Sequence, residues 1–131
     1  MYRVLTALFL VVASTVVSSA QGLLPVIWQS QRGAILKVLS ADPASGNFRG
    51  VFISAPGGPC PGVPYDVAGR KWGPRVAFRT WRTWTSDCRA TAVWSGRLVN
   101  PTTIVAHWRA TFVLPNGRRV TGRGTEVFHR I

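Results

Sequence analysis

Apolar and polar residues alternate in a series of short runs that fill the chain after residue 20. No segment in this part carries apolar residues at helical spacing over a useful length. Alternation with a period of two is typical of strands that bury one face. The pattern therefore predicts strands, which cover residues 25–31, 34–40, 48–54, 65–72, 74–81, 91–99, 103–115 and 118–131.

Turn-forming residues separate these strands. The segment DPASGN at residues 42–47 and the Pro115-Asn116-Gly117 turn are clear examples, and Asn-Gly is a strong signal for a tight hairpin. Because the connections are short, each strand is expected to pair with its neighbour in the sequence. An up-and-down barrel removes exposed strand edges, and a β-sandwich is the competing closure. We therefore expect an all-β fold, an eight-stranded antiparallel up-and-down β-barrel.

Tryptophan alternates with alanine on the expected inner faces of two strands. A barrel of this size holds packed side chains or one small ligand. Alanine leaves room beside each indole, where a solid core would more naturally place Val, Ile or Leu. One such face carries Ile104, Ala106, Trp108, Ala110 and Phe112, and another carries Ala90, Ala92 and Trp94.

The first 20 residues are interpreted as a secretory signal peptide. A basic start at Arg3 precedes an apolar run over residues 4–17 and a small-residue cleavage signal at residues 18–20. The apolar run is shorter than the roughly 20 residues that span a membrane. We expect residues 21–131, a stretch of 111 residues, to form one domain. This domain would be secreted to the extracellular space or the periplasm, with no membrane contact after cleavage.

Cys60 and Cys88 are the only cysteines. An even pair in an exported protein favours an intramolecular disulfide, and two buried, reduced thiols are the alternative. Cys60 lies in the Gly- and Pro-rich segment 54–64, which proline excludes from a central strand, so we expect a loop tied down by the disulfide. No metal site is expected, because two Cys and two isolated His lack the spacing of a ligand set.

Positive charge is the other unusual feature of the composition. Sixteen Lys and Arg oppose four acids, which gives a net charge of +12, or +11 once Arg3 leaves with the signal peptide (12 − 1). Such a balance fits attraction to nucleic acid, anionic lipid or acidic polysaccharide, and also plain solubility. The basic residues are spread along the strands, which favours solubility.

Nucleic-acid binding is the weaker alternative function. Basic and aromatic residues interleave as they do in single-strand binders, at Arg79, Trp81, Arg82 and Trp84. The export signal and the number of strands argue against a nucleic acid as the partner.

No enzymatic activity is expected. Ser95 does not lie in a nucleophile elbow, His107 and His129 have no acid or nucleophile at a recognisable spacing, and the four acids form no paired-carboxylate site. A binding function fits this composition better than catalysis.

The order of several short motifs resembles the avidin and streptavidin family. These motifs are WQSQRGA from Trp28, GVF from Gly50, YDVAGR from Tyr65, Trp81, WSG from Trp94, IVAHW ending at Trp108 and GTEVFHRI from Gly124. They span residues 28–131, nearly the whole expected mature chain. The resemblance implies an eight-stranded barrel with a cavity at its open end, and biotin as a ligand, with no cofactor.

The two cysteines are similar to those of the dimeric bacterial avidins, in which a disulfide joins two loops at the pocket. The short last hairpin carries no tryptophan of the kind that tetrameric members donate to a neighbouring subunit. The resemblance thus implies a Cys60–Cys88 disulfide and a homodimer.

The aromatic part of the family's biotin site carries over to this chain. The resemblance implies that Trp81, Trp94 and Trp108 form the walls of the cavity. Ala110 shares a face with Trp108 and would lie beside it.

The polar part of the family's site is largely replaced. The first-strand asparagine and serine correspond to Ser30 and Ala34, and the third-strand tyrosine corresponds to Phe52, so only Ser30 still carries a donor to the ureido oxygen. Ala90 and Ala92 stand where relatives have serine and threonine. Ser54 is retained at the cavity mouth, where it would meet a ligand carboxylate.

The roles of Glu126 and Arg32 each have two possible interpretations. Glu126 stands two residues before Phe128, where relatives place Asp or Asn to accept from a ureido N–H. It is either a ligand acceptor or one half of a structural ion pair. Arg32 replaces a small or apolar residue of the relatives, and it either supplies a lost donor or lies on the surface.

Losing three or four donors at about 1–3 kcal/mol each weakens binding by about two to seven decades. The leading hypothesis is therefore a secreted avidin-like protein that binds a small molecule, with biotin bound at reduced affinity. The alternative is a barrel reassigned to another planar or anionic ligand, or to a surface partner.

Overall fold

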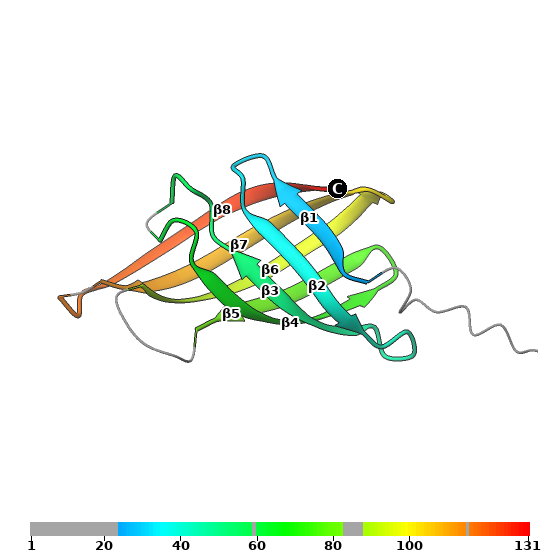
Figure 1. The fold of residues 1–131 in the computed structure, drawn as a ribbon, viewed down its shortest axis with the longest axis horizontal. Helices are drawn as coiled ribbons and strands as arrows, with labels where there is room; N and C mark the ends of the chain where they lie inside the picture. The colour runs from blue at the N-terminus through cyan, green and yellow to red at the C-terminus, as the bar shows by residue number, and fades with distance from the viewer. Residues whose placement is uncertain (1–23, 59, 83–87, 115) are drawn as a thin grey trace, which may run out of the picture.

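Eight antiparallel strands close into a barrel, which confirms the predicted fold class (Figure 1). The computed structural model describes residues 24–58, 60–82, 88–114 and 116–131, so the expected signal peptide lies outside the described residues. The strands are β1 (Val26–Ser30), β2 (Ile35–Ala41), β3 (Asn47–Ile53), β4 (Pro64–Trp72), β5 (Arg75–Trp81), β6 (Arg89–Asn100), β7 (Thr103–Val113) and β8 (Arg119–Arg130).

Each strand pairs with its neighbour in the sequence, and β8 returns to pair with β1. Ser30 lies opposite Phe128 in this closing pair, which brings the first and last strands together. Because every strand has two partners, no edge is left unpaired. The β-sandwich alternative is therefore wrong.

The inner faces of the strands follow the period of two that the sequence showed. In β5, for example, Val76, Phe78 and Thr80 are buried while Arg75 and Arg79 are exposed. The same alternation packs Leu36, Val67 and Phe128 at the centre of the barrel, where less than 2% of each is exposed. Burial of these apolar side chains is the main driving force for closing the barrel.

Residues 42–47 form the turn between β2 and β3, as the turn-forming sequence DPASGN predicted. Gly46 has φ of +78°, and a Cβ at this position would collide with the carbonyl oxygen of Lys71. The Gly46 N–H donates to Asp42 O at 2.8 Å, and the Lys71 N–H donates to Gly46 O at 2.9 Å. Only glycine meets both demands, so it fixes this turn against β4.

The last hairpin is tight, as Asn116-Gly117 predicted, while Pro115 lies outside the described residues. Leu114 N–H donates to Arg118 O at 2.9 Å, and Gly117 has φ of +81°. Within the described ranges no helix has the length and apolar character needed to cross a membrane.

Candidate ligand-binding site

A cavity of about 440 Å³ is bordered by the β3–β4 loop. This loop lies at the end of the barrel that also carries the β7–β8 connection, on the left in Figure 1. The size of the cavity is within the usual range for small-molecule sites. All the expected ligand-contact residues except Ser30 and Trp81 line it. They are Arg32, Ala34, Phe52, Ser54, Ala90, Ala92, Trp94, Trp108, Ala110 and Glu126.

Trp94 is the centre of the aromatic wall of this cavity. Its ring is stacked on Phe78, with centroids 5.2 Å apart and planes inclined by 9°. Phe52 lies 5.2 Å from it on the cavity side, and Trp108 lies 6.1 Å away on the neighbouring strand. The indole N–H donates to Thr80 Oγ1 at 3.4 Å. Trp94 is thus held on several sides before any ligand binds.

The structure corrects the expected position of Trp81. Because Thr80 is buried inside the barrel, the next residue along β5 points outward. The Trp81 ring lies on this outer face, 4.8 Å from the guanidinium carbon of Arg79. Phe78 is the residue of β5 that stacks on Trp94. The period-two alternation of β5 in the sequence predicts that Phe78 faces inward.

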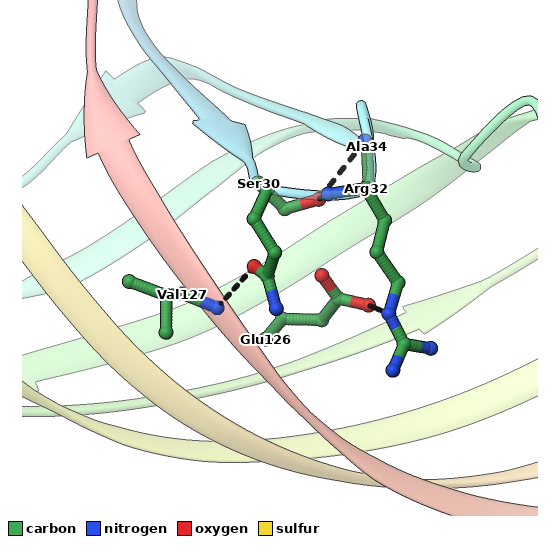
Figure 2. Close-up of polar contacts among 6 residues, drawn as sticks. Ser30, Arg32, Ala34, Glu126 and Val127 are labelled. Carbon is green, nitrogen blue, oxygen red and sulfur yellow. Dashed lines mark hydrogen bonds and ion pairs between the residues drawn. The ribbon is translucent and has the colours of Figure 1, made fainter.

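Ser30 is buried but does not line the cavity. Its Oγ accepts the backbone N–H groups of Ala34 at 3.0 Å and Arg32 at 3.3 Å, as Figure 2 shows in part. These bonds shape the turn between β1 and β2, and this turn presents Arg32 to the cavity. Ser30 therefore positions the site without lining it.

The hydroxyl groups of Ser54 and Tyr65 are used by the loops around the cavity. Ser54 Oγ donates to Cys60 O and accepts from Val63 N–H at 3.1 Å. Tyr65 OH donates to Cys88 O at 3.2 Å. Burial raises the pKa of the Tyr65 phenol, and the positive charge of Arg82 opposes part of that rise.

A disulfide joins Cys60 to Cys88, with their Cα atoms 5.8 Å apart, and this confirms the predicted intramolecular bridge. It ties the β3–β4 loop to the segment that leads into β6. Cys60 itself lines the cavity and is buried. The disulfide and the Tyr65 hydrogen bond together hold one rim of the cavity in place.

Glu126 is the acidic group of the cavity, and it is only 5% exposed. Figure 2 shows Arg32 reaching from the β1–β2 turn toward the Glu126 side chain on β8. Arg32 Nε lies 3.7 Å from Glu126 Oε1, whereas Glu126 Oε2 has no hydrogen-bond partner. Of the two alternatives drawn from the sequence, the ion pair is therefore present, and the role of Glu126 as a ligand acceptor stays a prediction.

Trp108 forms the wall next to Trp94, and Gly124 on β8 makes room for it. Gly124 lies opposite Trp108 in the β7–β8 pairing. A Cβ on Gly124 would come within 2.8 Å of the indole ring, so the ring lies directly against the glycine backbone. Trp108 Nε1 is buried and has no hydrogen-bond partner.

Thr80, Tyr65 and Phe112 also line the cavity, although no sequence motif pointed to them as site residues. Period-two alternation predicts Phe112 on the face of Trp108, and it would have placed Thr80 inside if counted from Phe78. Among the described residues, no group of three or more His, Cys, Asp or Glu could hold a metal ion.

Several solved structures with the same barrel are similar to this chain. The bradavidin2–biotin complex matches with a TM-score of 0.67 and 26% identity, covering 82% of this chain and 96% of that chain. The rhizavidin–biotin complex has a TM-score of 0.66 and 28% identity, covering 81% and 91%. For apo shwanavidin in its P21 form these values are 0.66, 26%, 82% and 97%.

The chain has the avidin fold and resembles avidin-family proteins of known structure. No protein-family model and no curated protein matches the sequence. The assignment therefore rests on the closed barrel, the Cys60–Cys88 disulfide and the structural likeness. The cavity of this chain combines an aromatic wall with a lining in which Ala34, Phe52, Ala90 and Ala92 carry no polar side-chain atom.

Proposed function

We propose that this protein binds a small biotin-like molecule, with its apolar part against Trp94 and Trp108 and its polar head toward Glu126. The observation that carries the proposal is a cavity with two adjacent indoles on its wall and a buried carboxylate at its polar end. Bradavidin2 and rhizavidin, which share the barrel, were both solved as biotin complexes.

Biotin is expected to bind this cavity more weakly than it would bind a cavity with a polar side chain at each of four lining positions. Ala34, Phe52, Ala90 and Ala92 line the cavity and carry no hydrogen-bonding side chain. The Ser54 proton is already donated within its loop. Each ligand group left without a partner costs about 1–3 kcal/mol, so the expected affinity falls by several decades.

Export and dimerisation belong to the same proposal. The disulfide supports an oxidising compartment, because such bonds rarely persist in the cytosol. Sequencing the N-terminus of the protein recovered from culture medium or periplasm is expected to give a start near Gln21. Recovery of the uncleaved chain from the cytosol would contradict export.

Isothermal titration of residues 21–131 with biotin tests the binding function. We expect saturable heat with one site per chain and an affinity well below that of a tight avidin complex. A Trp94→Leu variant is expected to lose the heat, because it removes the centre of the aromatic wall. Absence of heat at high biotin concentration, with the barrel shown folded by circular dichroism, would rule out biotin.

A further inference from the structure

Two buried polar atoms of residues that line the cavity lack hydrogen-bond partners: Glu126 Oε2 and Trp108 Nε1. A carboxylate oxygen removed from water without a donor is strongly unfavourable. Glu126 is 5% exposed and lines the cavity, so a donor on a ligand that enters the cavity would satisfy this oxygen. Glu126 thus requires a hydrogen-bond donor from the ligand.

Four other lining residues offer no free hydrogen-bond donor to a ligand oxygen. Ala34 and Phe52 have no polar side-chain atom, and the hydroxyls of Ser54 and Tyr65 donate to backbone carbonyls of Cys60 and Cys88. Donors among the lining residues are the Trp108 indole N–H and the Arg32 guanidinium, which already lies near Glu126. Glu126 supplies the acceptor oxygen that has no partner.

Arg32 already shows that a guanidinium can reach this carboxylate. Its Nε lies 3.7 Å from Glu126 Oε1, and its side chain is 62% exposed (Figure 2). At this distance and exposure the pair is loose, so the Arg32 side chain is free to exchange with a cation from solvent. A planar amidinium or guanidinium matches a carboxylate with two parallel N–H···O bonds.

We propose that the cavity selects planar, apolar molecules with an amidinium or guanidinium head, which binds Glu126 in exchange with Arg32. The proposal rests on the proposed ligand-binding function and names the head-group chemistry of that same site. A neutral amide would offer Glu126 a weaker hydrogen bond than a charged, bidentate head, and an anionic head would be repelled by Glu126. The positive charge of the whole chain slows the approach of a cation, but salt screens this long-range effect more than the buried pairing.

Three probes of equal shape test the head group: 2-naphthamidine, 2-naphthamide and 2-naphthoate. Their two-ring body fits against Trp94 and Trp108, and only the charge and the donors of the head differ. Titration calorimetry at neutral pH is expected to give 2-naphthamidine at least about tenfold tighter binding than 2-naphthamide, since charged hydrogen bonds are stronger. 2-Naphthoate is expected to bind weakest.

Variants assign the preference to the carboxylate. Glu126→Gln keeps the size of the side chain and is expected to remove the preference for 2-naphthamidine over 2-naphthamide. Asp66→Asn is the matched control, because it removes one negative charge from β4 outside the cavity lining. Arg32→Gln, on the exposed turn, is expected to strengthen 2-naphthamidine binding because the competing guanidinium is gone.

Biotin is titrated alongside the probes so that the two proposals are tested separately. One outcome would overturn this inference alone: the protein binds biotin, but it binds 2-naphthamide or 2-naphthoate as tightly as 2-naphthamidine, or more tightly. So would a preference that persists in Glu126→Gln, or a weaker 2-naphthamidine complex in Arg32→Gln. Absence of binding by all four compounds to the folded protein would overturn the proposed function as well.

Discussion

Trp108 depends on a glycine that lies beneath its ring. Gly124 and Gly122 both face this side chain from β8, but at different distances. A Cβ on Gly124 would lie within 2.8 Å of the indole, while a Cβ on Gly122 would make an ordinary contact at 3.4 Å. The two glycines therefore separate an effect on Trp108 from a general effect on β8.

Gly124→Ala is predicted to push the Trp108 ring into the cavity and to weaken ligand binding by about tenfold or more, because a displaced wall fills ligand space. Titration with biotin or 2-naphthamidine measures the change. Gly122→Ala is the control and is expected to bind within about twofold of the parent chain. Equal affinities for both variants would show that Trp108 does not shape the site.

Tyr65, at the rim of the cavity, is expected to make the stability of the protein depend on pH. Burial raises the phenol pKa above its ordinary value of 10.0, with opposition from Arg82. A raised pKa in the folded state means that its contribution to stability is complete below pH 10.0 and is lost as pH rises through the folded pKa. The free energy of unfolding is therefore predicted to fall at strongly alkaline pH.

The chain has two tyrosines, and Tyr2 lies in the expected signal peptide, so Tyr65 alone reports in residues 21–131. Its ultraviolet phenolate absorbance is expected to rise at higher pH in the folded protein than in the urea-unfolded protein. Tyr65→Phe should remove both the absorbance change and this part of the alkaline loss of stability. Coincident titration curves for folded and unfolded protein would contradict the prediction.

At the scale of elements, the β3–β4 loop is held mainly by covalent and backbone-directed contacts. The disulfide encloses a sequence separation of 28 residues, from Cys60 to Cys88. Ser54 binds Cys60 O and Val63 N–H within the same loop. This loop contributes a cavity rim without being a strand, so its position depends on these few bonds.

Removing the disulfide as Cys60→Ser with Cys88→Ser is predicted to reduce the free energy of unfolding by about 3–4 kcal/mol, on the chain-entropy estimate for a loop of this length. Urea unfolding of residues 21–131 measures the loss. The parent chain treated with a reductant is the control and should unfold at a similar urea concentration. An unchanged unfolding midpoint in the double variant would show that the loop is held without the disulfide.

At the scale of the whole molecule, a row of exposed arginine residues crosses part of the outer face of the barrel. Arg79, Val93, Arg109 and Arg123 form one row across β5 to β8, each paired with the next in the strand register. Val93 in this row is 61% exposed and Val99 on the same strand is 57% exposed. Exposed apolar residues, which favour contact with a second copy of the chain, therefore lie next to positive charges, which repel a second copy.

The proposed dimer is for this reason predicted to depend on salt. Light scattering is expected to show twice the monomer mass, with the dimer fraction rising as salt screens the repulsion between chains of +11 charge (12 − 1). A Val93→Ala variant, which shortens an exposed apolar side chain, is a direct probe of this face. A monomer at every salt concentration would contradict the dimer.

The sequence by itself determined the barrel. Alternation with a period of two defines which residues face inward, and short turns leave each strand no partner other than its neighbours. The same local rules placed Trp94, Trp108 and Ala110 on the cavity side. The cysteine pair was predictable because export and an even count favour a disulfide, which the structure contains.

Only the tertiary structure decided the polar end of the site. The motif order suggested Trp81 as a wall, but the register of β5 turns it outward and places Thr80 and Phe78 inside. Arg32 and Glu126 are far apart in the chain, and they meet because β1 pairs with β8 when the barrel closes. Closure also determines which Glu126 oxygen stays unbonded, since that depends on the three-dimensional position of every donor around it.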